Sequence, residues 1–317
     1  MASINLVTLD TGRGHTRSRH LIEEVLTAAG HQFAWSDATR EPPPGARYDL
    51  TIFYQDIIGA WLDTAPLNCL VPNQEWFDEG QLHLLARIDL VLAKTRHATD
   101  VFGRMGCRVE YTGFTAEDRK LRDVEPDLSR WLHVAGRSPL KGTGAVIEAW
   151  HANPELPHLL VVENTGWMGA QTTAANLSFI HDYVPDRVLR VLQNWCGVHL
   201  CPSEAEGWGH YLVEGMSVGA VVVTTDAPPM NELVTDERGV LCPYDSSRAR
   251  ALGVTYRVSP ATLADTVEAV VRRPAGELYE LGCRARAFYD ENDGAFAHRF
   301  VKAVGDLLAE GPSRAIP

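Results

Sequence analysis

The chain has 317 residues, of which 45% are hydrophobic and 22% are charged, a length that suits two domains better than one hydrophobic core. Its 29 basic and 41 acidic side chains give a formal net charge of −12, which disfavours an extended binding surface for DNA, RNA or an anionic membrane. An anionic ligand would have to be held locally, by a few cations and backbone amides.

The amino-terminal residues lack the basic and apolar regions of a secretory signal, and no apolar run approaches the roughly 20 residues of a membrane-spanning helix. We therefore expect a soluble, cytoplasmic protein with no transmembrane segment. The six cysteines form no C-x-x-C pair, which favours reduced core thiols over disulfides or a zinc site.

Short apolar runs alternate with helix-length segments in the first third of the chain. A helix is expected over 18–30, where Leu21, Ile22, Val25 and Leu26 recur at helical spacing before Gly30. This alternation predicts a parallel sheet covered on both faces. The polar segment 115–130 marks the domain junction. Strands are expected at 4–9, 31–37, 48–54, 67–72, 88–93 and 107–113.

The second part repeats the alternation and ends in three expected helices, at 260–273, 276–290 and 294–308. We predict an α/β protein of two Rossmann-like doubly wound domains facing across a cleft, with ligands at the carboxyl ends of the strands. The expected domains are 1–118 and 119–293, followed by a carboxy-terminal helix at 294–317. Strands are expected at 131–136, 158–164, 176–180, 197–203 and 219–225, and helices at 143–151, 186–195 and from about 210.

Residues 201–234 combine glycines, a predicted helix start and the acids Glu206 and Glu214. Two glycines flank Trp208, so backbone amides at the positive end of the helix can approach a phosphate. Glu206 precedes the helix and Glu214 lies inside it, and such acceptor-only carboxylates suit sugar or ribose hydroxyls. The alternative is a loop acid and a solvated helix acid.

Arg137 and Lys141 follow a predicted strand, among three glycines and before a helix. A guanidinium can grip a phosphate with two hydrogen bonds while an ammonium acts as a point charge. In a chain of net charge −12 the two cations indicate a local anion clamp, although both could be ordinary loop charges.

Taken together, GR-x-x-x-KG at 136–142 and PS-x-x-EGWG-x-x-x-x-EGMSVGAVVV at 202–223 resemble the nucleotide-binding domain of GT-B glycosyltransferases, specifically retaining family four. The shorter spacing between the two cations and EGMS in place of EAMA depart from the family pattern. The resemblance implies that Arg137 and Lys141 bind the donor diphosphate, together with the amides of Trp208 and Gly209. It implies that Glu206 contacts the transferred sugar and that Glu214 binds the ribose hydroxyls. Ile180 and His181 would lie near the base, and His210 would be among the donor-binding residues.

The amino-terminal turn offers a second nucleotide-binding hypothesis. Gly12 and Gly14, with Asp37 at the end of the next strand, partly match the dinucleotide fingerprint, but Arg17 stands where a third small residue should be. This alternative function is an NAD(P)-dependent oxidoreductase. In a glycosyltransferase the same turn would approach the donor phosphate or the acceptor. His15 would then lie near that ligand, or it could be a solvated loop histidine.

The acceptor side departs from the family, because Asn73, Gln74 and Glu75 stand near the strand end where an acceptor-side histidine is common. Glu75 either orients or deprotonates an acceptor hydroxyl, or caps the following helix. Lys94, Thr95 and Arg96 follow the next predicted strand and could also line the cleft. We favour Thr95 as a helix cap.

Metal chemistry has no motif here, since the chain contains neither H-E-x-x-H nor Asp-x-Asp. We therefore expect no metal and no cofactor, and a leaving diphosphate stabilised by cations and helix amides.

The sequence thus predicts a metal-independent, retaining glycosyltransferase that uses a UDP-sugar or GDP-sugar, with a non-catalytic sugar-nucleotide binder as a further alternative. A saccharide or small molecule is the expected acceptor. A modified nucleic-acid base ranks below it and would need a small basic groove. The residues available for such a groove are Arg13, Arg17, Arg19, Lys94 and Arg96.

Overall fold

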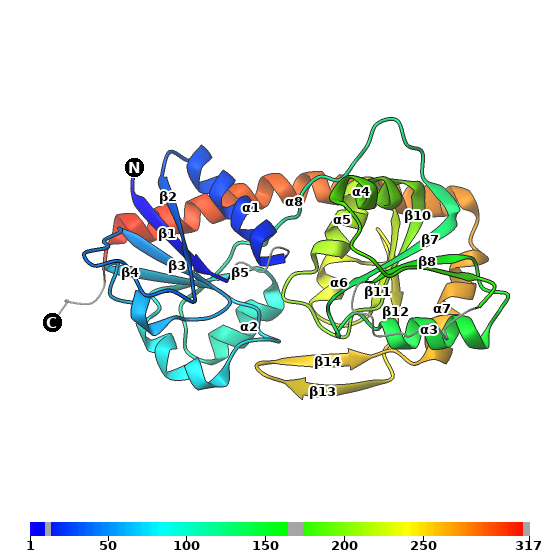
Figure 1. Cartoon of the computed structure of the whole chain (residues 1–317), viewed down its shortest axis with the longest axis horizontal. Helices are drawn as coiled ribbons and strands as arrows, with labels where there is room; N and C mark the ends of the chain where they lie inside the picture. Colours follow the sequence, from blue (N-terminus) through cyan, green and yellow to red (C-terminus); the bar gives the residue numbers. More distant parts are fainter. Residues whose placement is uncertain (10–13, 164–173, 313–317) are drawn as a thin grey trace. The chain divides into compact units, whose positions relative to one another are not determined.

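The computed structural model describes residues 1–9, 14–163 and 174–312. The chain divides into two compact units. The first unit comprises Met1–Ala116, Ala249–Gly253 and Asn292–Pro317, and the second comprises Glu117–Arg248 and Val254–Glu291. Each unit contains one six-stranded parallel sheet with helices packed against it (Figure 1), which confirms the predicted class of two Rossmann-like domains.

The sheet of the first unit has the strand order β2-β1-β3-β4-β5-β6, and all six strands occur where apolar runs predict them. Strands β3, β4 and β5 are buried at every position, which is why they read as continuous apolar runs rather than alternating ones. The strands are β1 Ser3–Thr8, β2 Gln32–Asp37, β3 Leu50–Tyr54, β4 Leu67–Val71, β5 Leu90–Ala93 and β6 Val109–Tyr111.

Two α-helices and two 3-10 helices complete the amino-terminal part of this unit. Helix α1 spans Gly14–Ala28 and buries Ile22 and Leu26. Helix α2 spans Arg96–Arg104, and the Thr95 hydroxyl accepts a hydrogen bond from the Ala98 amide at 3.0 Å, which confirms the predicted cap. The 3-10 helices are η1 Gly59–Trp61 and η2 Glu79–Arg87.

The sheet of the second unit has the order β12-β11-β10-β7-β8-β9. Helices α3 and α7 cover one face, and α4 and α5 cover the other (Figure 1). Trp131 and Trp150 lie in the main core with their ring centroids 6.4 Å apart. The elements are β7 Asp127–Gly136, α3 Thr143–Ala152, β8 Leu159–Glu163, β9 Leu177–Ile180, α4 Asp186–Trp195, β10 Cys196–Cys201, α5 His210–Val218, β11 Val221–Thr225, α6 Met230–Leu233, β12 Val240–Cys242 and α7 Pro260–Val271.

The carboxy-terminal prediction of two separate helices after α7 is wrong. Helix α8 is continuous over Ala275–Glu310 and runs through Asn292 and Asp293. Within the first unit the Asn292 amide donates to the Phe114 carbonyl at 2.7 Å, and Asp293 accepts from the Thr115 hydroxyl at 2.8 Å. These polar side chains hold a neighbouring segment instead of capping a helix.

Three strands escape the sequence pattern. Strand β12 is only three residues long, and β13 Ser246–Arg250 pairs with β14 Gly253–Arg257 in a separate two-stranded sheet. Strand β13 is polar and largely exposed, so it shows no apolar run. None of the described helices has both the length and the apolar character needed to cross a bilayer. All six cysteines are unpaired thiols.

Candidate functional site

Two helices of the second unit begin beside neighbouring strand ends. Helix α3 follows β7 and helix α5 follows β10, and β7 and β10 are adjacent in the sheet. Both helices start after a glycine with left-handed backbone, Gly142 at φ 67° and Gly209 at φ 103°, and neither start has a capping side chain. The first-turn amides therefore present the positive end of each helix dipole without a side-chain acceptor at the N-cap.

Both glycines have a positive φ, and Gly142 is also packed closely against backbone. A Cβ at Gly142 would lie 2.2 Å from the Pro202 carbonyl oxygen, just past β10. A Cβ at Gly209 would lie 2.8 Å from a methyl carbon of Leu212. A side chain at Gly142 would displace the start of α3 from Pro202, whereas one at Gly209 would require the Leu212 side chain to move and would be strained by the positive φ.

Lys141 and Glu206 meet at these helix starts. The Lys141 ammonium lies 2.5 Å from Glu206 Oε1, and their side chains are only 15% and 12% exposed. Glu206 Oε1 also accepts from the Ser203 hydroxyl at 2.5 Å. The Lys141 ammonium lies 3.6 Å from the centre of the Tyr211 ring, a cation–π contact. The structure thus brings together a cation and an acceptor carboxylate that the sequence assigns to one donor.

Neutral side chains surround this ion pair. The Tyr211 hydroxyl lies 2.5 Å from Ser203 Oγ, and burial raises the pKa of Tyr211 well above its ordinary value. Burial likewise raises the pKa of the Cys201 thiol. Both groups stay protonated at neutral pH, so Lys141 and Glu206 carry the charge here. The sequence offers no signal for Tyr211, which looks like an ordinary apolar-face residue of α5.

His133 ties α3 to the sheet. Its Nδ1 lies 2.7 Å from the Leu200 carbonyl oxygen and its Nε2 lies 2.9 Å from the Thr143 hydroxyl. Burial, with a further contribution from the charge of Lys141, lowers the pKa of His133 to about 4. The neutral ring donates from Nδ1 to the carbonyl and accepts at Nε2 from Thr143, the first residue of α3.

Glu214 lies inside α5 and is only 3% exposed, so the alternative of a solvated helix acid is wrong. Its Oε2 accepts a hydrogen bond at 2.8 Å from Nε2 of Gln193, a buried residue of α4. Sequence reasoning missed Gln193, because it sits within an otherwise regular amphipathic helix.

The other donor-side candidates are spread around this centre. Arg137 is exposed, and no ion pair to it occurs within the described part of the chain. His181 follows β9, stacks on Phe179 with ring centroids 5.2 Å apart, and has Nδ1 2.6 Å from Glu163 Oε1. Trp208 is buried, and His210 is the first residue of α5.

The first unit contains a separate polar cluster at the ends of β3, β4 and β5. Asn73 Nδ2 donates to Gln55 Oε1 at 2.9 Å, and His15 Nε2 lies 3.0 Å from the same oxygen. Lys94 is 1% exposed, and its ammonium donates to Asn73 Oδ1 and lies 3.4 Å from the Tyr54 hydroxyl. Burial and then the charge of Lys94 lower the pKa of His15, so its ring is neutral at pH 7.

Three expectations for the first unit are corrected or limited here. The helix that follows Glu75, η2, is capped by Asp78 instead, which accepts from the Gly80 amide at 2.9 Å. Lys94 is buried, so it cannot line an exposed basic groove. Gly12 and Arg13 lie outside the described residues, whereas Gly14 begins α1 and Asp37 ends β2 as the fingerprint requires.

A protein-family comparison matches most of the second unit's sheet and the candidate site. Residues 132–258, which contain the Lys141–Glu206 pair and both glycine-started helices, match the family model described as glycosyl transferases group 1. This part of the second unit thus resembles a group 1 glycosyltransferase domain. No curated protein sequence matches the chain.

Solved glycosyltransferases share the fold of the whole chain. A sucrose-phosphate synthase from Thermosynechococcus elongatus is 14% identical, with a TM-score of 0.74 over 98% of this chain and 100% of the other. Anabaena HepE, solved with UDP and glucose, is 14% identical, with a TM-score of 0.69 over 97% and 100%. A glycosyltransferase from Rickettsia africae is 12% identical, with a TM-score of 0.69 over 96% and 98%. At these identities the comparisons establish the GT-B fold of the chain.

Proposed function

We propose that this chain is a retaining glycosyltransferase that transfers a sugar from a nucleotide-diphosphate sugar to an acceptor hydroxyl without a metal ion. The observation that carries the proposal is the Lys141–Glu206 pair beside two helix starts that lack capping side chains, within the segment matched by the family model. The solved structure of HepE with UDP and glucose supports a UDP-sugar, and a GDP-sugar is the other candidate.

The donor diphosphate lies at the starts of α3 and α5 in this proposal. First-turn amides donate to its oxygens, and Lys141 and Arg137 supply the positive charge. Glu206 accepts a hydrogen bond from a hydroxyl of the transferred sugar and keeps Lys141 in place. Glu214 accepts hydrogen bonds from the ribose hydroxyls, and His181 lies against the base.

Transfer breaks the bond between the anomeric carbon and the diphosphate oxygen and forms a bond from the acceptor oxygen to the same carbon. With retention, the acceptor attacks from the face that the diphosphate leaves, and the acceptor proton passes to a diphosphate oxygen. Fixed amides and cations stabilise the charge that develops on the leaving group, and removing one such donor costs about 10²–10³-fold in turnover. The first unit binds the acceptor, a saccharide or small molecule, through Asn73, His15 and Glu75.

The test measures sugar transfer and donor hydrolysis across a panel of UDP- and GDP-sugars. Lys141→Met and Arg137→Met should each lower turnover by about 10²-fold or more. Arg137→Met should leave the unfolding transition unchanged because Arg137 is exposed, whereas Lys141→Met should lower stability because it leaves the largely buried Glu206 without its cation. Arg187→Met is the matched control, because Arg187 is an exposed cation of α4 outside the site. A chelator should not change the rate.

Each rival hypothesis corresponds to a different result. Wild-type rates in both Lys141→Met and Arg137→Met would overturn the site assignment, and an inverted anomeric product would overturn retention. Tight binding of nucleotide sugars without transfer or hydrolysis would indicate a non-catalytic binder. Binding of NADH in place of nucleotide sugars would favour the oxidoreductase, which leaves the match at 132–258 unexplained.

A further inference from the structure

A chain of buried polar groups leads from the start of the second unit to Glu214. Arg119 lies in the segment expected to be a polar junction, yet it is 0% exposed. Its Nε donates to Gln193 Oε1 at 2.9 Å, and Gln193 Nε2 donates to Glu214 Oε2 at 2.8 Å. Gln193 and Glu214 are 1% and 3% exposed, so water does not compete strongly for these bonds.

The chemistry of the two neighbours fixes the orientation of the Gln193 amide. A guanidinium only donates hydrogen bonds and a carboxylate only accepts them, so the oxygen of Gln193 must face Arg119 and its nitrogen must face Glu214. The positive charge of Arg119 polarises the amide and strengthens the bond that Gln193 donates to the carboxylate.

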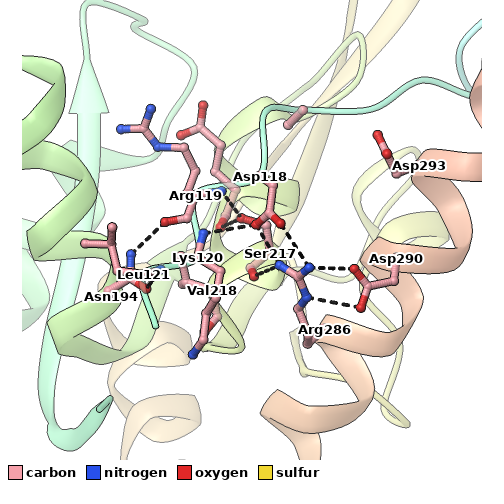
Figure 2. Close-up of polar contacts among 12 residues, drawn as sticks. Asp118, Arg119, Lys120, Leu121, Asn194, Ser217, Val218, Arg286, Asp290 and Asp293 are labelled. Carbon is pink, nitrogen blue, oxygen red and sulfur yellow. Dashed lines mark hydrogen bonds and ion pairs between the residues drawn. The ribbon is translucent and has the colours of Figure 1, made fainter. Parts of the chain in front are cut away.

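A second path holds the backbone of Glu214. The Arg119 amide donates to the Ser217 hydroxyl at 3.1 Å, and that hydroxyl donates to the Glu214 carbonyl at 2.7 Å. The guanidinium of Arg119 is itself held by both carboxylate oxygens of Asp186 at 2.9 Å. Asn194, the residue after Gln193, accepts a hydrogen bond from the Leu121 amide and donates one to the Arg119 carbonyl (Figure 2).

We propose that Gln193 is a positioning residue for the donor ribose: it orients the Glu214 carboxylate so that this group accepts ribose hydroxyls. This inference rests on the proposed function. A direct pair between Arg119 and Glu214 would occupy both carboxylate oxygens with a two-pronged guanidinium. Through Gln193, the charge of Arg119 supports the carboxylate while the amide occupies only one of its roughly four acceptor positions.

The experiment measures affinities by calorimetry for UDP and GDP and for their 2′,3′-dideoxy counterparts, which lack the hydroxyls that Glu214 would accept. For the nucleotide it binds, the wild-type protein should prefer the ribose form by about 10-fold or more, because hydrogen bonds to a charged acceptor are the strong ones. Gln193→Met keeps the length and bulk of the side chain but removes the amide. It should weaken the ribose form by about 10-fold and bring the two forms within about 3-fold, with the dideoxy affinity unchanged.

Two further variants separate positioning from stability. Gln193→Asn keeps a polar side chain that is one methylene too short to bridge Arg119 and Glu214, and it gives the same test if Gln193→Met does not fold. Asn194→Met removes a neighbouring, equally buried amide of α4 that holds the junction segment. Asn194→Met should lower stability but keep the ribose preference.

The outcomes distinguish the inference from the proposed function. A wild-type preference that persists in Gln193→Met and Gln193→Asn overturns the positioning role, as does an equal weakening of ribose and dideoxy forms. Wild-type binding of nucleoside diphosphate without any ribose preference overturns the assignment of Glu214 and the inference with it. A wild-type protein that binds no nucleoside diphosphate overturns the proposed function itself.

Discussion

Two buried histidines should make the second unit sensitive to mild acid. Burial lowers the pKa of His133 and of His199 to about 4, against an ordinary value of 6.5. Each folded-state pKa lies below the unfolded one, so the unfolded chain binds protons that the native protein excludes. The stability that each neutral ring contributes is complete above about pH 6.5 and is lost progressively as the pH falls toward 4.

The magnitude follows from the size of the shift. At pH 5 both histidines are largely protonated in the unfolded chain and largely neutral in the native protein. One pKa unit corresponds to 1.36 kcal/mol, so each histidine should cost about 2 kcal/mol of unfolding free energy between pH 7 and pH 5. That is a substantial part of the stability of an ordinary domain, about 5–15 kcal/mol.

The assay is urea unfolding at pH 7 and pH 5, followed by circular dichroism. In His199→Gln and His133→Gln the loss on acidification should be smaller than in the wild-type protein by about 2 kcal/mol. His20→Gln is the control, because the His20 side chain is 56% exposed and should leave the loss unchanged. If the two buried-site variants lose as much stability as the wild-type protein, the neutral buried rings are not the cause.

Two more predictions concern single contacts. Gly142→Ala should cost about 2 kcal/mol or more in urea unfolding, because φ is 67° and the new Cβ would lie 2.2 Å from the Pro202 carbonyl oxygen. Gly144→Ala, with nothing within 4 Å of its Cβ, should instead be neutral or stabilise by up to about 1 kcal/mol, and equal costs would contradict the packing argument. Lys94→Met should raise the pKa of His15, measured by NMR of the ring, because the charge of Lys94 is the second cause that lowers this pKa, after burial. An unchanged pKa would show that the charge of Lys94 does not reach the ring.

The parallel sheets were predictable because central strands buried on both faces must be apolar along their whole length. Strands β3, β4 and β5 of the first unit and β10 and β11 of the second are buried at every position. The glycine-started helices were predictable for a related reason, since left-handed backbone at Gly142 and Gly209 excludes most other residues. Backbone requirements and continuous burial are local properties, so they appear in the sequence.

The polar interior was not predictable, because whether a polar side chain is buried depends on partners far along the chain. Arg119 looked like part of a solvated junction, but its partners Gln193 and Asp186 lie more than 60 residues away. Asn292 lies between the two helices predicted at 276–290 and 294–308, and its partner is Phe114. In each case the residue type allows either role, and the tertiary contact decides between them. The motif residues proposed to contact the donor are therefore easier to find than the residues that hold them, and Gln193, which belongs to no motif, could be found only through its contact with Glu214.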